Sequence, residues 1–374
     1  MPSLETAFAR RASGFDTPPF PKFTMSNEAC RQSAPRILIV RLSAVGDVIH
    51  GLPVLNALRG ALPDAFLAWA VEDRAAAMLR GHPALDELIV LPRGFLKSPG
   101  QVWQLRRRLH ELRFDTAIDL QGLAKSAIVA RLSGAPRRIG FGDEKGRELS
   151  RWLNNDLVRP HSAHIIDCNL ELLEPLGIQP PPARFEIPES AADAAAAMEI
   201  IRQQRLQAGF GIINPGAGWP SKLWPAERFA AVAAYLGRVE RLPTLVVWAG
   251  ERENAWARQI VTGSEGHARE APRTSLCELA ALCRRAVLFV GSDTGPLHLA
   301  AAVGTACVGM YGPMSAQRNG PYGSQHVALQ EMTFQGRSRQ RKKAPATLME
   351  AIGVELVCEA CSWILRRDGW QAAA

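Results

Sequence analysis

Short apolar, β-branched runs that alternate with segments long enough for a helix are the feature that most restricts how this chain can fold. In the first part of the chain the runs lie at 37–40, 66–71, 87–91 and 116–120. Parallel strands are buried on both faces and are joined by crossover helices. The alternation therefore predicts an α/β sandwich with a parallel sheet.

A second alternation of the same kind begins after a change of composition around 180–182 and an alanine-rich helical stretch at 191–207. Its strand-like runs lie at 211–214, 244–248, 287–291 and 306–311. A chain of 374 residues also exceeds the size of about 250 residues at which single cores stop growing. We expect two Rossmann-like domains that face a central cleft.

The expected domain limits follow from these patterns. Residues 1–34 are expected to be a disordered extension, 35–190 the first Rossmann-like domain and 206–330 the second. Residues 331–374 carry a basic loop and an amphipathic helix that we expect to pack back on the first domain.

Composition and charge exclude several classes of protein. No apolar run reaches the roughly 18 residues that a membrane span needs, and the N-terminus lacks the apolar core of a signal peptide, so we expect a cytoplasmic protein. The net charge of +8 favours an anionic partner. Nucleic acid is disfavoured because the arginines are spread along the chain without a recognised binding motif.

Seven scattered cysteines indicate reduced thiols, since they do not form the framework of a small disulfide-rich domain. Cys358 and Cys361 have the spacing of half a zinc site. No second pair accompanies them, so we interpret them as two positions on a helix.

A glycine and an aspartate follow the first strand, at Gly46 and Asp47. Ligands in such folds bind beyond the carboxyl ends of the strands, so Asp47 is a candidate base in the cleft. The alternative is that it caps the next helix, which a single acidic residue at such a place does more often than it acts as a base. The run lacks G-x-G-x-x-G, which disfavours a nicotinamide oxidoreductase.

Three loops after strands of the second unit carry further candidates. Small residues at Ala217 and Gly218 precede Lys222, an arrangement that can bring amides and an ammonium to a phosphate, or be a plain turn. Glu253 can accept hydrogen bonds from ribose hydroxyls. Asp293 begins the run Asp293–Gly295, where it either binds hydroxyls or caps a helix.

Each loop has an ordinary structural explanation, but together they place an acid, a lysine, a glutamate and an Asp-Gly pair after strands of two facing units. That combination predicts a nucleotide-sugar cleft. In this ordered set the chain, from residue 36 to about 330, resembles the ADP-heptose lipopolysaccharide heptosyltransferases of glycosyltransferase family 9. The stretches 46–53, 119–127 and 292–295, with His298, resemble the heptosyltransferase I branch most.

This resemblance implies a GT-B fold, with the acceptor on the first domain and the donor on the second. It implies that Asp47 is the catalytic base, that Lys222 contacts the donor phosphates, and that Glu253 holds the ribose. Asp293 and Gly295, with Thr294 and His298 beside them, are implied to hold the heptose and diphosphate, and Ala217 and Gly218 stand where the family often has threonine.

The implied partners are ADP-heptose and an anionic lipid-linked glycan, the Kdo/lipid A inner core, met by peripheral contact with the inner membrane surface. Basic and polar residues of the first domain are candidates for binding this acceptor: Arg93, Lys97, Gln121, Lys125, Arg137, Arg147 and His164. Cys168 stands where the family's H-x-x-x-R pattern, starting at His164, offers an arginine.

The implied reaction is an inverting transfer without a metal or other cofactor, because the sequence has no D-x-D pair. Two alternatives remain open at this stage. One is a related transferase that uses another sugar or acceptor. The other is a non-catalytic protein that binds sugar nucleotides, which the presence of Asp47 disfavours.

Overall fold

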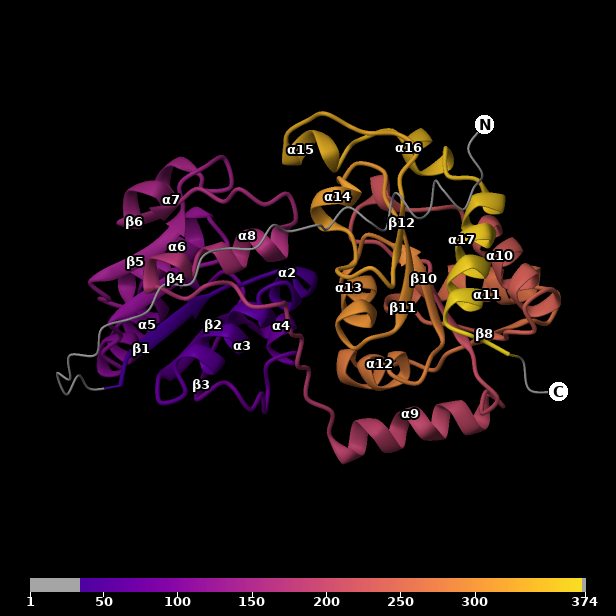
Figure 1. Ribbon diagram of the computed structural model, residues 1–374, viewed down its shortest axis with the longest axis horizontal. Coiled ribbons are helices and arrows are strands. Elements are labelled where there is room, and N and C mark those ends of the chain that lie inside the picture. The colour runs from indigo at the N-terminus through magenta and orange to yellow at the C-terminus, as the bar shows by residue number, and fades with distance from the viewer. Residues whose placement is uncertain (1–33, 372–374) are drawn as a thin grey trace.

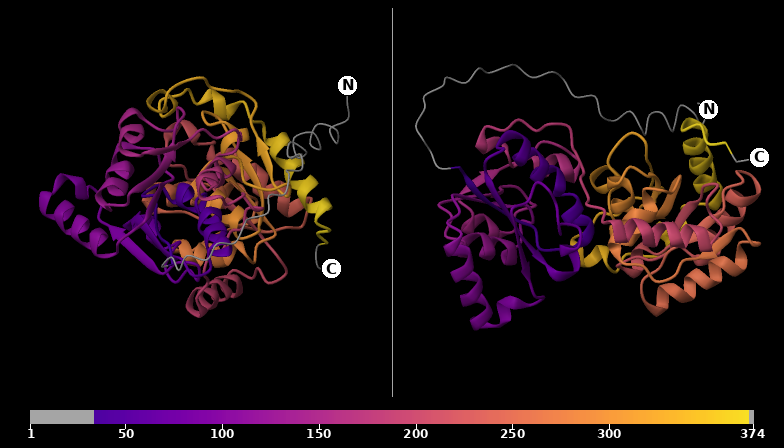
Figure 2. Two further views of the ribbon diagram at one scale, coloured as in Figure 1. Left: turned by 60° about the vertical axis from the view of Figure 1, so that its left-hand side comes forward. Right: turned by 90° about the horizontal axis from the view of Figure 1, so that it is seen from below.

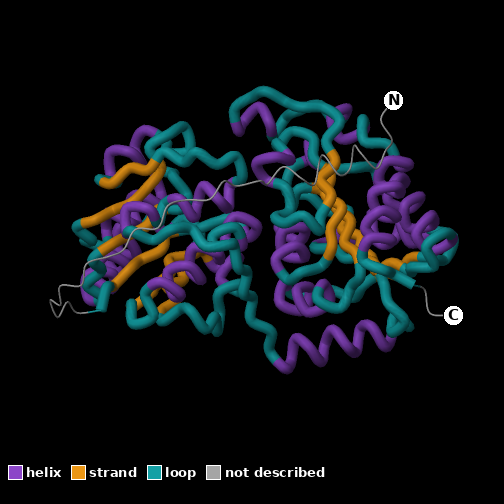
Figure 3. Tube along the Cα trace, viewed as in Figure 1, coloured by secondary structure: helices purple, strands orange, loops and turns teal. Residues whose placement is uncertain are grey.

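The computed structural model describes residues 34–371, which form two α/β halves lying side by side (Figure 1). We call residues 34–177 the first half and 191–371 the second half. The expected N-terminal extension lies, apart from residue 34, outside the described residues. Figure 3 shows strands in the interior of each half, with helices and loops around them.

The first half contains a six-stranded parallel sheet of order β3-β2-β1-β4-β5-β6. Its strands are β1 (Arg36–Val40), β2 (Phe66–Glu72), β3 (Glu87–Leu91), β4 (Thr116–Asp119), β5 (Arg137–Phe141) and β6 (Asp156–Val158). The predicted runs are thus confirmed as strands.

The second half repeats this strand order as β9-β8-β7-β10-β11-β12, again with parallel strands. These are β7 (Gly211–Asn214), β8 (Thr244–Val246), β9 (Ala268–Glu270), β10 (Leu288–Ser292), β11 (Ala306–Met310) and β12 (Val327–Leu329). In both sheets the chain starts in the middle and winds outward in two directions, so the order reverses between β1 and β4 and between β7 and β10. Ligands of doubly wound sheets bind at such points.

Central strands are mostly apolar because helices cover both faces of each sheet. Residues 37–40 of β1 are at most 1% exposed. The first-half helices are α2 (Val45–Ile49), α3 (Leu52–Ala61), α4 (Asp73–Ala76), η1 (Phe95–Lys97), α5 (Pro99–Glu111), α6 (Ala124–Leu132), α7 (Glu148–Leu153), α8 (Ile165–Glu171) and η2 (Glu174–Leu176).

The helices of the second half cover its sheet and extend to the C-terminal part of the chain. They are α9 (Ala191–Gln203), η3 (Pro220–Lys222), α10 (Ala226–Arg238), α11 (Gly250–Gly263), α12 (Leu276–Cys283), α13 (Gly295–Ala302), α14 (Ala316–Asn319), α15 (Ser338–Arg341), α16 (Thr347–Glu350) and α17 (Val354–Arg367). Among residues 34–371 no helix is both long and apolar enough to cross a membrane.

The C-terminal helix α17 packs on the second half, so the expectation that it packs back on the first domain is wrong. It lies against α10 and the strands β10 to β12, far from the first half in both views of Figure 2. Its apolar stripe, including Val357, Cys361 and Ile364, is buried in the core of the second half. Cys358 and Cys361 are free thiols on this helix, as interpreted from the sequence.

The halves meet where the carboxyl ends of their central strands face each other. Helix α2, which follows β1, packs against α13, which follows β10. One apolar core cluster runs through this contact and includes Ile49 of the first half and Leu297 of the second. Tyr322 adds a polar tie, because its hydroxyl donates to Asp167 Oδ1 at 2.7 Å.

Candidate active site

Asp47 lies in the first turn of α2, at the edge of the first half that faces the second. Its Oδ1 pairs with Arg41 Nη2 at 2.7 Å, and its Oδ2 accepts a hydrogen bond from the Ala44 amide at 3.0 Å. The Asp47 side chain is nevertheless 43% exposed, whereas that of Arg41 is 7% exposed. The carboxylate is therefore fixed in direction and still open to a ligand.

Two of the predicted acceptor residues lie beside this aspartate loop. Gln121 Oε1 accepts a hydrogen bond from the Leu42 amide at 2.9 Å. Lys125 Nζ donates to Ser43 Oγ and pairs with Glu72 Oε1, each at 3.0 Å. The β4–α6 segment thus braces the loop that carries Asp47.

Three basic candidates lie on exposed parts of the same half. Arg93 and Lys97 follow β3, at the same edge of the sheet as Asp47. Arg147 precedes α7, and its amide donates to the Gly122 carbonyl at 3.0 Å. All three are therefore within the first-half rim formed by the ends of the strands.

Arg137 lies elsewhere, so we remove it from the candidate acceptor residues. It is the first residue of β5, level with the beginning of β1 and hence at the edge of the sheet opposite Asp47. Its guanidinium is occupied by Asp156 Oδ2 at 2.8 Å and by the Pro175 carbonyl at 2.5 Å.

His164 is buried at the boundary between the halves. Its Nδ1 accepts a hydrogen bond from the Ile166 amide at 3.2 Å, and its Nε2 lies 3.0 Å from the Gly320 carbonyl. Both ring nitrogens are engaged, so His164 joins the halves and has no nitrogen left for an acceptor. Cys168, one turn further along α8, is buried, and burial raises its thiol pKa.

In the second half, Lys222, Asp293 and His298 form one bonded network. Lys222 Nζ lies 2.6 Å from Asp293 Oδ2, and His298 Nε2 lies 3.0 Å from Asp293 Oδ1. Burial by itself raises the pKa of Asp293, but the His298 hydrogen bond and the Lys222 charge outweigh it and hold the pKa below its usual value. The network places a charged lysine beside the amino end of α13.

The backbone around that helix end is ordered by further contacts. Asn214, the last residue of β7, donates to Thr294 Oγ1 at 3.3 Å. Thr294 directly precedes α13, and Gly295 is its first residue. The first amides of a helix lack partners within the helix and favour anions. An anion at Gly295 would therefore meet both free amides and Lys222.

Glu253 lines a separate pocket with Ala217 and Gly218, as predicted from their loops. The other lining residues are Pro220, Leu223, Ala249, Gly250, Glu251, Arg252 and Trp256. Glu253 Oε2 accepts a hydrogen bond from the Ala249 amide at 2.8 Å, and partial burial raises the pKa of its carboxyl. The pocket offers a hydrogen-bond acceptor and an aromatic surface next to the loop that carries Lys222.

The halves also approach each other closely at Gly46. A Cβ built on Gly46 would lie 2.9 Å from His298 Cδ2 and 3.5 Å from Gly295 Cα. This contact brings the aspartate loop directly against the amino end of α13. Within residues 34–371 no three histidine, cysteine or acidic side chains are grouped to hold a metal.

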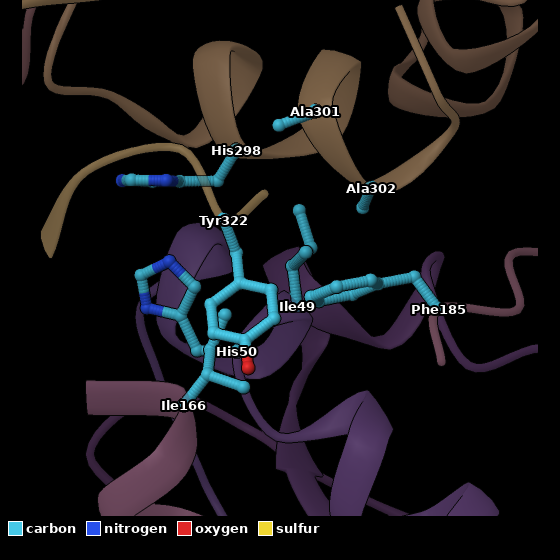
Figure 4. A pocket seen from close by; sticks show the side chains of 8 residues that line it. All are labelled: Ile49, His50, Ile166, Phe185, His298, Ala301, Ala302 and Tyr322. Atoms are coloured by element: carbon cyan, nitrogen blue, oxygen red, sulfur yellow. The ribbon is translucent and has the colours of Figure 1, made fainter. Parts of the chain in front are cut away.

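Figure 4 shows His50 and His298 facing each other across the boundary, with Tyr322 and Phe185 beside them. The His50 and His298 rings are 4.3 Å apart at an interplanar angle of 70°. His50 is buried, neither ring nitrogen has a hydrogen-bond partner among residues 34–371, and burial holds its pKa well below the usual value. An uncharged His50 is therefore part of the packed contact between the halves.

Sequence reasoning assigned no role to Arg41, Trp219 or His50. Arg41 directly follows the first strand, and a buried arginine needs a carboxylate partner, so its pairing with the nearby Asp47 had a local signal. Trp219 contacts Lys222, whose Nζ lies 4.6 Å from the ring centroid. The environment of His50 depends on residues far along the chain and left no such signal.

Comparison with known proteins gives one family match. The model of glycosyltransferase family 9 (heptosyltransferase) matches residues 102–348. Lipopolysaccharide heptosyltransferase 1 of Pseudomonas aeruginosa is 30% identical over 308 residues, which cover 79% of this chain and 83% of that protein. Lipopolysaccharide core heptosyltransferase OpsX of Haemophilus influenzae is 27% identical over 293 residues, covering 77% and 82%.

Solved structures show the same architecture. The glycosyl transferase family 9 protein of Veillonella parvula superposes with a TM-score of 0.78 at 25% identity, covering 91% of this chain and 100% of that one. Escherichia coli heptosyltransferase WaaC with ADP superposes with a TM-score of 0.69 at 23% identity, covering 88% of this chain and 99% of that one. The predicted fold class, two Rossmann-like domains of GT-B type, is confirmed.

Proposed function

Because this chain belongs to glycosyltransferase family 9, the heptosyltransferases, we propose that it transfers heptose from ADP-heptose to the Kdo/lipid A inner core of a lipopolysaccharide precursor. The chain is a glycosyltransferase of the heptosyltransferase type, and the resemblance noted in the sequence is confirmed. The donor, the acceptor and the roles of the residues are the parts proposed here.

One observation carries the proposal. The loop with Asp47 abuts the amino end of α13, where Lys222 and Asp293 form their ion pair. In the proposal, Asp47 is the base on the acceptor side, and the end of α13 binds the diphosphate on the donor side. Glycosyl transfer needs both, because the acceptor hydroxyl must lose a proton as the diphosphate gains charge.

In the proposed reaction Asp47 takes the proton of the acceptor hydroxyl while that oxygen attacks the anomeric carbon. The bond from this carbon to the phosphate oxygen breaks on the opposite face, so the configuration inverts and ADP leaves. Arg41 keeps the Asp47 carboxylate in position through their 2.7 Å ion pair.

The donor occupies the second half in this proposal. Glu253, in its pocket with Ala217 and Gly218, accepts hydrogen bonds from the ribose, and Lys222 with the Gly295 amide stabilises the leaving diphosphate. Asp293 holds the lysine and binds heptose hydroxyls. A relative of the same fold was solved with ADP-2-deoxy-2-fluoro heptose, which is consistent with this donor.

The acceptor occupies the first half, near Gln121 and Lys125, and approaches over Arg93, Lys97 and Arg147. A lipid-linked acceptor stays at a membrane, so the enzyme works by peripheral contact with the cytoplasmic face of the inner membrane. Exposed cations near an anionic surface favour such contact.

The decisive experiment is a donor screen followed by mass spectrometry. The enzyme is incubated with ADP-heptose, ADP-glucose or a UDP-hexose, with and without phosphorylated Kdo-lipid A. We expect one heptose to be added only when ADP-heptose and this acceptor are both present. Transfer of another sugar, or ADP-heptose binding without transfer to any acceptor, would reject the proposal.

A further inference from the structure

A strongly cationic segment outside the proposed mechanism connects β12 to the C-terminal helices. Residues 337–343 read Arg-Ser-Arg-Gln-Arg-Lys-Lys, with five cations in seven positions. We call residues 337–343 the basic segment. It includes α15, and Arg337, Arg339, Lys342 and Lys343 are exposed.

The basic segment is attached to the loop that carries Lys222. Ser221 Oγ donates to the Arg341 carbonyl at 2.8 Å. Lys342 Nζ lies 5.3 Å from the centroid of the Trp219 ring, the same ring that Lys222 Nζ approaches at 4.6 Å. Figures 1 and 2 place α15 at the boundary between the two halves. The segment therefore forms part of the rim of the cleft.

Within residues 34–371, the charges of the basic segment lack the carboxylate partners that several cations of the first half have. Lys125 and Lys145 pair with Glu72 and Asp143 in the first half. By contrast, no ion pair within residues 34–371 includes a cation of the basic segment. Clustered like charges repel one another, so an anionic ligand is favoured there.

We propose that the basic segment binds the phosphate groups of the lipid-linked acceptor, so that the acceptor is held from both halves. This inference rests on the proposed function, which supplies an acceptor carrying phosphates. In the proposed function, Lys222 and the amides at Gly295 already bind the donor diphosphate, further inside the cleft than the basic segment. The exposed cations at the rim are left for a second anionic group that enters from outside.

The test removes three rim charges without disturbing the contacts to Ser221 and Trp219. The variant carries Arg337→Gln, Arg339→Gln and Lys343→Gln. The matched control carries Arg202→Gln, Arg238→Gln and Arg269→Gln, which removes the same charge from exposed positions elsewhere in the second half. Both are assayed with the phosphorylated acceptor and with the same acceptor after enzymatic removal of its phosphates.

We expect the rim variant to raise KM for the phosphorylated acceptor about tenfold at low salt, since three exposed contacts each contribute modestly. The KM for the dephosphorylated acceptor and the affinity for ADP should stay unchanged, and the control should match the wild type throughout. The effect should shrink as salt is raised, because exposed charges are screened.

Several results would overturn the inference. A loss of ADP affinity would assign the segment to the donor, and equal effects on both acceptors would remove the phosphates from the explanation. Weaker binding to anionic vesicles, with unchanged KM for an acceptor lacking its acyl chains, would assign it to the membrane surface. If the wild type transferred no heptose, the proposed function itself would fail and this inference with it.

Discussion

Asp119 and Asp293 lie near the carboxyl ends of corresponding strands in the two halves and have different environments. Asp119 ends β4, and Asp293 directly follows β10, the corresponding strand of the second half. Asp119 is fully buried, and its hydrogen bonds within residues 34–371 come from neutral donors, which include the amides of Gln121 and Gly122, the Ser150 hydroxyl and the Asn154 amide. Asp293 is held by Lys222 and His298.

The pKa shifts of the two carboxyls follow from these partners. Burial raises the pKa of Asp119, and its neutral donors only moderate the rise. For Asp293 the His298 hydrogen bond and the Lys222 charge reverse the effect of burial. An aspartate near the end of the corresponding strand thus orders a loop in one half and is part of a charged network in the other, because the partners differ.

The largest expected effect is the loss of turnover when the proposed base of the first half is removed. If Asp119 is structural, the reactive carboxylate of that half is Asp47. Asp47→Ala should lower turnover by about 100- to 10,000-fold, because it removes a positioned base, while ADP affinity stays near that of the wild type. Steady-state kinetics and calorimetry with ADP measure the two quantities.

Asp47→Asn serves as the control, since it preserves shape and can still accept from the Ala44 amide. It should be as inactive as the alanine variant. Near-normal turnover in either variant would reduce Asp47 to a residue that orders the start of α2.

The next effect tests the charged network of the second half. Lys222→Ala should weaken ADP binding and lower turnover together, by about 10- to 100-fold, because a charged hydrogen bond to phosphate acts in the ground state and in the transition state. EDTA should change neither quantity. An absolute requirement for added divalent metal would contradict the role proposed for this lysine.

Asp119→Asn should act on stability instead of chemistry. All of these partners of Asp119 are donors, and an asparagine must turn its own NH₂ donor toward one pair of them. At least one buried donor then loses its acceptor, so we expect a loss of about 1–3 kcal/mol in the free energy of unfolding. Urea unfolding measures it at neutral pH. Turnover of the folded variant should stay within a few-fold of the wild type, and a large loss in kcat would break the comparison.

Asp293 and Asp119 should contribute to the free energy of unfolding with opposite dependences on pH. Asp293, with its lowered pKa, stabilises above the unfolded value of 3.8, and this contribution is lost as the pH falls through the lowered pKa. The wild-type advantage over Asp293→Asn should therefore shrink on acidification below that value. Asp119 has a raised pKa, so the advantage over Asp119→Asn should grow as the pH falls toward 3.8.

The smallest effect concerns the ribose pocket. Burial raises the pKa of Glu253, so it takes up a proton at a higher pH than an ordinary glutamate. A protonated carboxyl loses acceptor capacity, and ADP affinity should fall by up to about fivefold as the pH is lowered through that raised pKa. Calorimetry across pH measures the fall. Glu253→Gln should bind ADP with no such dependence, and an unchanged pH profile would remove Glu253 from the ribose site.

Most of the fold could be predicted from the sequence because central parallel strands require uninterrupted apolar runs. The same rule located Asp47, Lys222 and Asp293, since each follows a predicted strand. The packing of α17 could not be predicted in this way. Its apolar stripe requires a partner surface, but the residues of that surface, such as Phe229 and Val308, lie far along the chain.

The acceptor residues show where the sequence was less informative. A run of arginines gives no direction for its side chains, and Arg137 starts its strand, so it lies at the wrong edge of the sheet. His164 was predicted to bind the acceptor, but its Nε2 is bonded to the Gly320 carbonyl, 156 positions away in the chain. Contacts between the halves thus decided what local patterns left open.

The contact at Gly46 limits how independently the two halves can change. A single methyl group there would press on His298 and act as a wedge between α2 and α13, leaving the core of each half intact. Misplacing reacting groups by about 1 Å can cost about 100-fold in rate. The distance between Asp47 and the donor therefore depends on the absence of a side chain at Gly46. A larger residue at position 46 would be tolerated only together with a smaller one at position 298.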